Sequence, residues 1–301
     1  MTPVVLVVQH QELCPPGWVG EWLTEEGLLL ELRHPYAGDP LPADLREHDG
    51  LVVLGGQMGA NDDEAYAWLS PTKGLIRCGA EIGVPVLGIC LGHQLAAVAL
   101  GGEVVVNATG KRRGVLDTSW ADDVVDDDVL GACGPRAVFW HRDVVTRLPE
   151  GTRVLARAQT GELVAARYAP TVWGVQCHPE ARIDIVTGWA AKDRALAASD
   201  AEEADVDRAL AAVTSAGREL AAAWRPLAAG FAEQVRASAA SDGVPAKYLS
   251  EARRPCEVSW RSAGSLRSIV AKRRTSWGEL RGENFVGRTS WGELRGENFV
   301  G

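Results

Sequence analysis

One cysteine of this 301-residue sequence lies between two glycines, in the stretch GICLG at residues 88–92. Cys90 follows the apolar run VPVLGI (84–89) and precedes LAAVALGG (95–102), which reads as a helix. The pattern glycine-x-nucleophile-x-glycine is typical of a sharp turn from a strand into a helix, with the nucleophile at the bend. A thiol at that helix N-terminus is favoured as the thiolate, and the Leu91 N–H would supply half of an oxyanion hole. The alternative is a small buried thiol at a tight junction.

A second polar cluster offers the groups that a cysteine nucleophile needs. The stretch VQCHPE (175–180) places His178 and Glu180 two residues apart, with Pro179 between them. Proline restricts the preceding residue to extended geometry, in which residues two apart face the same side. An imidazole beside a carboxylate is a base with its orienting group. Either motif alone has a plain structural alternative, a surface turn in the case of HPE, but together they predict a catalytic triad of Cys90, His178 and Glu180.

The surrounding elements predict an α/β fold. Three β-branched runs, at 4–8, 51–54 and 84–89, are apolar throughout, as are strands buried on both faces of a parallel sheet. Helix-sized stretches lie between them, at 17–27 and 65–83. This alternation favours an open, mostly parallel sheet flanked by helices. We expect an α/β domain over residues 1–190.

The C-terminal part of the chain divides into two segments of different composition. Residues 191–240 are expected to form a helical extension packed on the domain, because an apolar stripe at helical spacing runs from Val206 to Val235, although Pro226 is expected to break or kink it. Residues 241–301 are a basic tail with 11 Lys/Arg and 7 Asp/Glu, expected to be disordered. It ends in a tandem duplication of RTSWGELRGENFVG at 274–287 and 288–301. A dispensable duplication is the simpler explanation, and a two-copy docking peptide is the alternative.

The motifs GICLGHQ and QCHPE together resemble both signatures of the class I, or triad, glutamine amidotransferases. The resemblance covers roughly residues 4–190. It points to the stand-alone branch that is similar to the amidotransferase domain of GMP synthetase and that includes plant γ-glutamyl peptidases. It implies a flavodoxin-like three-layer fold. It also implies that Cys90 forms a γ-glutamyl thioester, that His178 moves the proton and that Glu180 holds the imidazole.

The resemblance implies further site residues. The segment LGGQMGANDD (54–63) is similar to the family's glycine-rich loop, where the Gly56 N–H would complete the oxyanion hole with that of Leu91. Gln94 matches a position that contacts bound glutamine. In FWHRDVV, His141 and Asp143 match residues that bind the α-amino and carboxylate ends of the substrate. Two departures stand out: Gln57 and Gly59 replace residues of the family pattern GGPxS, and Arg142 replaces a glycine.

Three functions stay open on the sequence. The first is hydrolysis of glutamine with ammonia supplied to a separate synthase, because the chain has no phosphate-cradling loop with which to activate an acceptor. The second is a γ-glutamyl peptidase or hydrolase with the same triad. The third is a non-catalytic adaptor that uses the duplicated tail. No cofactor is expected, and the partners expected are glutamine or a γ-glutamyl compound and a synthase acting in trans.

Composition excludes other classes of protein. The net charge of −9 argues against a nucleic-acid binder, and the absence of a long apolar run argues against a membrane protein. Six cysteines without paired spacing, in a chain with no secretory leader, favour a cytoplasmic protein with reduced thiols. The same lack of paired spacing speaks against a zinc site. The basic run 111–113 and the acidic run 121–128 are both expected to be solvated.

Overall fold

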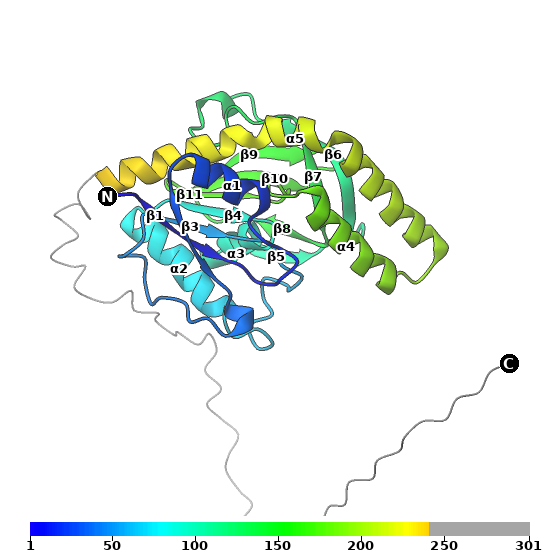
Figure 1. Ribbon diagram of the computed structural model, residues 1–301, viewed down its shortest axis with the longest axis horizontal. Coiled ribbons are helices and arrows are strands. Elements are labelled where there is room, and N and C mark those ends of the chain that lie inside the picture. Colours follow the sequence, from blue (N-terminus) through cyan, green and yellow to red (C-terminus); the bar gives the residue numbers. More distant parts are fainter. Residues whose placement is uncertain (241–301) are drawn as a thin grey trace, which may run out of the picture. The chain divides into compact units, whose positions relative to one another are not determined.

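The computed structural model describes residues 1–240, so the tail and its duplication at 241–301 lie outside the described residues. A nine-stranded sheet in the order β2-β1-β3-β4-β11-β10-β9-β6-β7 forms the centre of this part of the chain (Figure 1). Its first five strands are parallel. They are β2 (Leu29–Arg33), β1 (Val4–Val8), β3 (Gly50–Val53), β4 (Val86–Ile89) and β11 (Val172–Val175). The predicted open α/β architecture is confirmed, and the three apolar runs are the parallel strands β1, β3 and β4.

The other four strands extend the sheet in antiparallel pairing. They are β10 (Leu163–Ala169), β9 (Arg153–Ala158), β6 (Arg112–Trp120) and β7 (Arg136–His141). A separate antiparallel pair joins β5 (Glu103–Val106) to β8 (Asp143–Arg147). Two short 3₁₀ helices, η1 (Pro35–Ala37) and η2 (Val124–Asp126), lie in the connections. The sheet is therefore mixed, with a parallel part that carries the cysteine motif.

Helices cover both faces of the sheet, as its buried strands require. Helices α1 (Gly17–Glu25) and α5 (Asp200–Ala240) contribute to one core, which takes in Val5 and Val7 of β1. Helices α2 (Leu69–Ile82) and α3 (Leu91–Ala99) contribute to the other, with Leu6 and Val8 of the same strand. Figure 1 shows α5 above the sheet and α2 and α3 below it. Successive side chains of one strand thus enter opposite cores, which explains the continuous apolar runs.

Two helices follow the last strand, as the sequence predicts. Helix α4 (Ile183–Leu196) and the 41-residue α5 pack on each other and share a third core with β7. The apolar stripe from Val206 to Val235 forms the buried face of α5. Of the break or kink expected at Pro226, the break is absent, because α5 continues through this residue. The division proposed at residue 190 falls inside α4 and stays a prediction. Within residues 1–240, no helix has both the length and the apolarity needed to cross a bilayer.

The parallel strands bring the sequence motifs together. Chain direction is shared by β1, β3, β4 and β11, so the segments that follow them emerge at one edge of the sheet. Those segments carry Gln11, Gly56, Cys90 and His178. Residues at the carboxyl ends of parallel strands form the ligand sites of open α/β folds.

Candidate active site

Cys90 occupies the bend between β4 and α3. Its φ of 51° and ψ of −103° make it the non-glycine residue with positive φ among residues 1–240. Such a conformation costs about 1–3 kcal/mol and persists where the surrounding structure enforces it. Here the Cys90 N–H donates to the carbonyl of Val175 at 2.8 Å, and α3 begins at the next residue. The geometry is that of a strained strand-to-helix turn that presents a thiol.

Close backbone packing explains the glycines on either side of Cys90. A Cβ on Gly92 would lie 2.0 Å from the carbonyl oxygen of Val53 in β3. A Cβ on Gly88 would lie 2.5 Å from the carbonyl carbon of Gly92. Both contacts involve backbone, which cannot move aside as a flexible side chain can. The glycines therefore let the helix start directly against the sheet.

Gly92→Ala is expected to destabilise the fold by about 3 kcal/mol or more, because the new methyl group overlaps the β3 backbone. Gly217→Ala in α5 is the matched control, since a Cβ there would meet nothing within 4 Å. The control is expected to leave stability unchanged or to raise it by about 0.5–1 kcal/mol. Urea unfolding of the two variants measures the difference. Equal free energies of unfolding would contradict this account of the elbow.

His178 and Glu180 form a buried pair beside the elbow. The His178 Nδ1 lies 2.7 Å from the Glu180 Oε1, and the two residues are only 4% and 1% exposed. The His178 N–H donates to the carbonyl of Val138 at 2.8 Å, which fixes the segment against β7. The Trp189 ring of α4 packs on the imidazole, with 4.6 Å between centroids. Backbone, carboxylate and indole together set the orientation of the imidazole.

Charge and burial act on the His178 ring in opposite directions. Burial disfavours the imidazolium, but the neighbouring Glu180 and Cys90 outweigh it and hold the pKa of His178 well above its ordinary value. The Nε2 atom has no hydrogen-bond partner within residues 1–240. A Cβ placed on Gly55 would lie 3.3 Å from the His178 Cε1 and 3.7 Å from the Cys90 Cβ. Gly55 therefore packs closely against both side chains. The arrangement suits proton exchange between the thiol and the imidazole.

The two residues predicted to supply an oxyanion hole, Gly56 and Leu91, lie next to each other. Leu91 is the first residue of α3, where N–H groups have no acceptor within the helix. Gly56 lies against it, since a Cβ on Gly56 would be 2.9 Å from the Leu91 Cδ2. Both residues flank Cys90 at the same edge of the sheet. Their role as oxyanion donors is a proposal that this placement supports.

A pocket of about 290 Å³ opens above the thiol, and Cys90, His178 and Gly56 line it. The three residues predicted to bind substrate, Gln94, His141 and Asp143, line it as well. The Gln94 amide nitrogen donates to the carbonyl of Asp143 at 2.9 Å and to the Gln176 Oε1 at 3.1 Å. These bonds occupy its amide donors inside the protein, so Gln94 holds the start of β8 whether or not it also touches substrate.

His141 and Asp143 differ in what they can offer a ligand. Burial, with a smaller contribution from the nearby His178, lowers the pKa of His141 to about 3, so the ring is neutral at pH 7. Neither His141 ring nitrogen has a hydrogen-bond partner within the described part of the chain. The Asp143 carboxylate instead accepts a bond of 2.9 Å from Arg142, the residue that departs from the family pattern. Their roles in substrate binding remain proposals.

Several residues that contact Cys90 or line the pocket escape prediction from the sequence. Gln176 donates to the Cys90 Sγ at 3.6 Å, and its place two residues before His178 is the signal that would have found it. Gln11, Lys111, Trp189, Lys192 and Asp193 also line the pocket, together with the apolar side chains of Leu13 and Leu196. Four of these seven residues, Trp189, Lys192, Asp193 and Leu196, come from α4, which lies far from Cys90 in the sequence.

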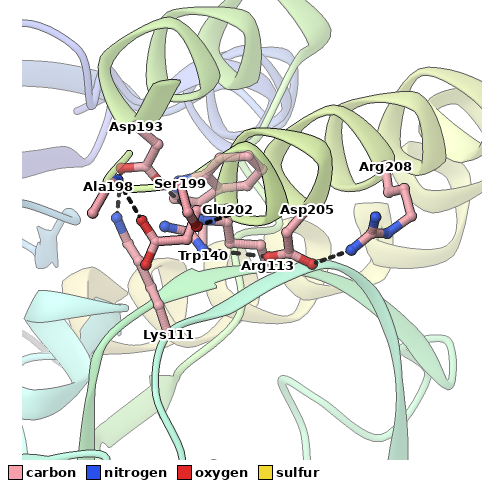
Figure 2. Close-up of polar contacts among 9 residues, drawn as sticks. All are labelled: Lys111, Arg113, Trp140, Asp193, Ala198, Ser199, Glu202, Asp205 and Arg208. Atoms are coloured by element: carbon pink, nitrogen blue, oxygen red, sulfur yellow. Dashed lines mark hydrogen bonds and ion pairs between the residues drawn. The ribbon is translucent and has the colours of Figure 1, made fainter. Parts of the chain in front are cut away.

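The basic run 111–113 forms ion pairs within the protein, although Lys111 is exposed, so the expectation that the whole run is simply solvated is wrong. Lys111 and Arg113 bind the two oxygens of Asp193 at 2.5 and 2.7 Å. The Trp140 Nε1 donates to the same carboxylate at 3.0 Å. Figure 2 shows Lys111, Arg113 and Trp140 around Asp193, which α4 carries. Arg112 turns the other way and binds Glu162 at 2.9 Å.

Asp193→Asn is expected to lower the free energy of unfolding at pH 7 by about 2–3 kcal/mol, since Lys111 loses its counter-charge and Arg113 keeps only the half-exposed Asp205. Burial alone would raise the pKa of Asp193, but Lys111 and Arg113 outweigh it and lower that pKa. Because the folded-state pKa is depressed, the stabilisation is present above the unfolded pKa of about 3.9 and is lost as the pH falls through the folded value. In urea unfolding at pH 7 and at successively lower pH below 4, the gap between wild type and variant should narrow as the pH falls; a constant gap would contradict the assignment.

No group of three or more His, Cys, Asp and Glu side chains suited to a metal ion occurs among the described residues. His93 lies next to the motif but contacts the hydroxyl of Tyr168 at 3.2 Å. Cys177 is completely buried, and desolvation raises the pKa of its thiol well above the ordinary value. Neither residue adds to the chemistry of the pocket.

Comparisons with known proteins agree with this geometry. The family described as glutamine amidotransferase class-I matches residues 30–185. A relative from Methanosarcina barkeri, named as a glutamine-hydrolysing GMP synthase component, is 40% identical over 138 residues, which are 44% of this chain and 65% of that protein. The match thus spans just under two thirds of that relative's length.

Solved structures share the fold over most of the chain. A glutamine amidotransferase from Thermotoga maritima is 24% identical, with a TM-score of 0.68 over 77% of this chain and 99% of its own. Another, from Methylobacillus flagellatus, is 26% identical, with a TM-score of 0.65 over 78% of this chain and 96% of its own. The family match covers the elbow cysteine and the His–Glu pair that the fold brings into one pocket, and the chain belongs to the class-I glutamine amidotransferase family.

Proposed function

We propose that this protein hydrolyses the side-chain amide of glutamine and supplies the ammonia to a separate synthase. The observation that carries the proposal is the meeting of the strained Cys90 with the buried His178–Glu180 pair in one pocket. Strain at the nucleophile, a raised imidazole pKa and a carboxylate orienter are the parts of an acyl-transfer site. A merely structural cysteine has no need of them.

The reaction follows from the positions of these groups. The Cys90 thiolate attacks the amide carbon, and the oxygen becomes an oxyanion facing the Gly56 and Leu91 N–H groups. The imidazolium of His178 gives its proton to the nitrogen, the C–N bond breaks and ammonia leaves. A water molecule, deprotonated by His178, then attacks the thioester, releasing glutamate and returning the proton to the site. Glu180 keeps the imidazole oriented through both halves of the cycle.

The need for a partner rests on the chain's contents and on its relatives. The GMP synthase relatives are named as glutamine-hydrolysing subunits. The sequence itself carries no phosphate-binding loop that would activate an acceptor for ammonia. A synthase acting in trans would complete the reaction. The adaptor hypothesis rests on the duplicated tail, which lies outside the described residues.

A second candidate, cleavage of γ-glutamyl amides larger than glutamine, is favoured by the mouth of the pocket. Leu13 and Leu196 line it and are 39% and 71% exposed. Apolar side chains at an open rim would accept a substituent on the amide nitrogen.

The test measures ammonia and glutamate released by the purified chain from glutamine, beside a panel of γ-glutamyl peptides. Equal amounts of both products from glutamine support the proposal. Cleavage of the peptides alone would replace it with the second candidate. A rise in glutamine hydrolysis on addition of a GMP synthetase that lacks its own amidotransferase would identify the class of partner.

A further inference from the structure

The glycine-rich loop after β3 is held from two sides by polar side chains. The Gln57 N–H donates to the Gln11 Oε1 at 3.3 Å, from the segment between β1 and α1. The Gln57 side-chain oxygen accepts a hydrogen bond from the Lys192 Nζ of α4. Gln11 is held in turn, since its amide nitrogen donates to the Cys14 Sγ at 3.0 Å. All four residues line the catalytic pocket.

This loop needs an external support. Three of the residues 55–59 are glycine, which gives the backbone wide conformational freedom. Yet Gly56 has to present its N–H within a few tenths of an ångström of a fixed position if it is to stabilise an oxyanion. Gln57 is the next residue along the chain, so contacts that fix its backbone and side chain also fix the peptide next to Gly56.

Lys192 differs from the other cations around the pocket, because it binds this loop and not a carboxylate of the described residues. Lys111 is neutralised by Asp193 at 2.5 Å, and Arg142 by Asp143 at 2.9 Å. Lys192 forms no ion pair with a carboxylate among residues 1–240; its hydrogen bond is to the Gln57 amide. The ammonium group therefore joins α4 to the loop across the pocket.

We propose that Gln11, Gln57 and Lys192 form a clamp that positions the oxyanion-stabilising N–H of Gly56. Lys192 and Gln11 are positioning residues in this proposal, because they act through Gln57 and not on the reacting atoms. The inference rests on the proposed amide hydrolysis for its catalytic consequence, but not for the clamp itself. It also accounts for a departure of the sequence: Gln57 stands where the family pattern GGPxS has proline, whose fixed φ would rigidify the loop without such support.

The experiment compares Lys192→Met with Arg194→Met, a matched loss of one positive charge from the same helix. Arg194 pairs with the exposed Asp207 of α5 and does not line the pocket. Both variants are also made in a Gln57→Pro background, with Gln57→Ala as the substitute if the proline variant does not fold. Two quantities are measured: steady-state kinetics of glutamine hydrolysis, and hydrogen–deuterium exchange of the backbone amides of residues 54–60.

Lys192→Met is expected to lower kcat about fivefold to tenfold with KM nearly unchanged, since a misplaced oxyanion donor weakens the transition state only. Exchange in residues 54–60 should rise in this variant and stay at the wild-type level in Arg194→Met. In the Gln57→Pro background, Lys192→Met should change kcat by less than about twofold, because the contact that it removes is already absent.

Three results would overturn the proposal. A rise in KM at constant kcat would show that Lys192 binds the substrate directly. An equal loss of kcat in both backgrounds would show that Lys192 does not act through Gln57. Unchanged exchange in residues 54–60 would show that the loop needs no clamp. If wild type fails to hydrolyse glutamine or any γ-glutamyl compound, the proposed function fails, while the exchange measurement still decides whether the clamp exists.

Discussion

Replacing Cys90 with alanine is expected to abolish glutamine hydrolysis, with kcat lower by about four orders of magnitude or more. The loss is this large because no other group in the pocket can form the thioester. The other pocket thiol, Cys14, is buried, and desolvation together with the nearby Glu180 carboxylate raises its pKa to about 12. Its sulfur also accepts a hydrogen bond from Gln11 and is therefore already engaged. Mass spectrometry of protein quenched during turnover should find a glutamyl adduct on Cys90 in wild type and none in the variant.

Cys177→Ala is the matched control for this prediction. The Cys177 thiol is adjacent to His178 in sequence but faces the core, where it is completely buried. Its removal should cost stability, not catalysis, with kcat per folded molecule within about twofold of wild type. Turnover by Cys90→Ala at a rate near that of wild type would reduce the elbow to a structural feature and remove the basis of the proposed function.

Glu180→Gln is expected to lower kcat/KM at pH 7 by about three orders of magnitude. Glutamine keeps the size of the side chain, and the Glu180 Oε2 has no hydrogen-bond partner to lose within residues 1–240. The missing negative charge is what changes the chemistry. Without it, burial is opposed by Cys90 alone, so the imidazolium of His178 becomes less favourable and the ring is left without its charged orienter.

The same substitution has a predicted sign in pH titration. In wild type, burial lowers the pKa of His178, but Glu180 and Cys90 raise that pKa by more than burial lowers it. The ring therefore stays protonated as the pH rises past the ordinary histidine range. In Glu180→Gln the ring should lose its proton at a lower pH than in wild type. NMR titration of the histidine ring resonances measures both values, with His178→Gln to assign the signal. A His178 titration at the same pH in both proteins would contradict the assignment of Glu180 as its partner.

Asp184→Asn is the control for charge removal near the site. Asp184 is exposed, belongs to the first turn of α4 and pairs with Arg182 at 2.8 Å. An exposed pair of this kind contributes at most about 1 kcal/mol, and its loss should leave kcat/KM within about twofold of wild type.

Much of the fold was predictable because its signals are local. A strand buried on both faces has to be apolar throughout, so the runs at β1, β3 and β4 were visible in the sequence. Strand β2 escaped prediction because it is the edge of the sheet and mixes exposed and half-buried residues. Strand β6 escaped for a related reason. Its polar residues, such as Arg113, look solvated in the sequence and are satisfied only by distant partners.

The acidic run 121–128 shows the same limit. The sequence predicts a solvated loop, yet the side chain of Asp127 is completely buried. It accepts hydrogen bonds from the backbone of Val129 and Leu130 and from the indole of Trp173, 46 residues away. A buried carboxylate is tolerated because these donors replace water. No local sequence pattern predicts a hydrogen-bond partner that far along the chain.

By itself the sequence predicted a nucleophile, its base and its orienter at Cys90, His178 and Glu180. The elbow depends on two glycines beside a cysteine, and His178 and Glu180 share one extended segment, so short-range geometry is sufficient to predict both motifs. Only the tertiary structure decided what surrounds them. Helix α4 forms one side of the pocket. Its Asp193 pairs with Lys111, 82 positions away, and its Lys192 binds Gln57, 135 positions away. Such contacts follow from how the layers pack, and packing is a property of the whole chain rather than of any stretch of it.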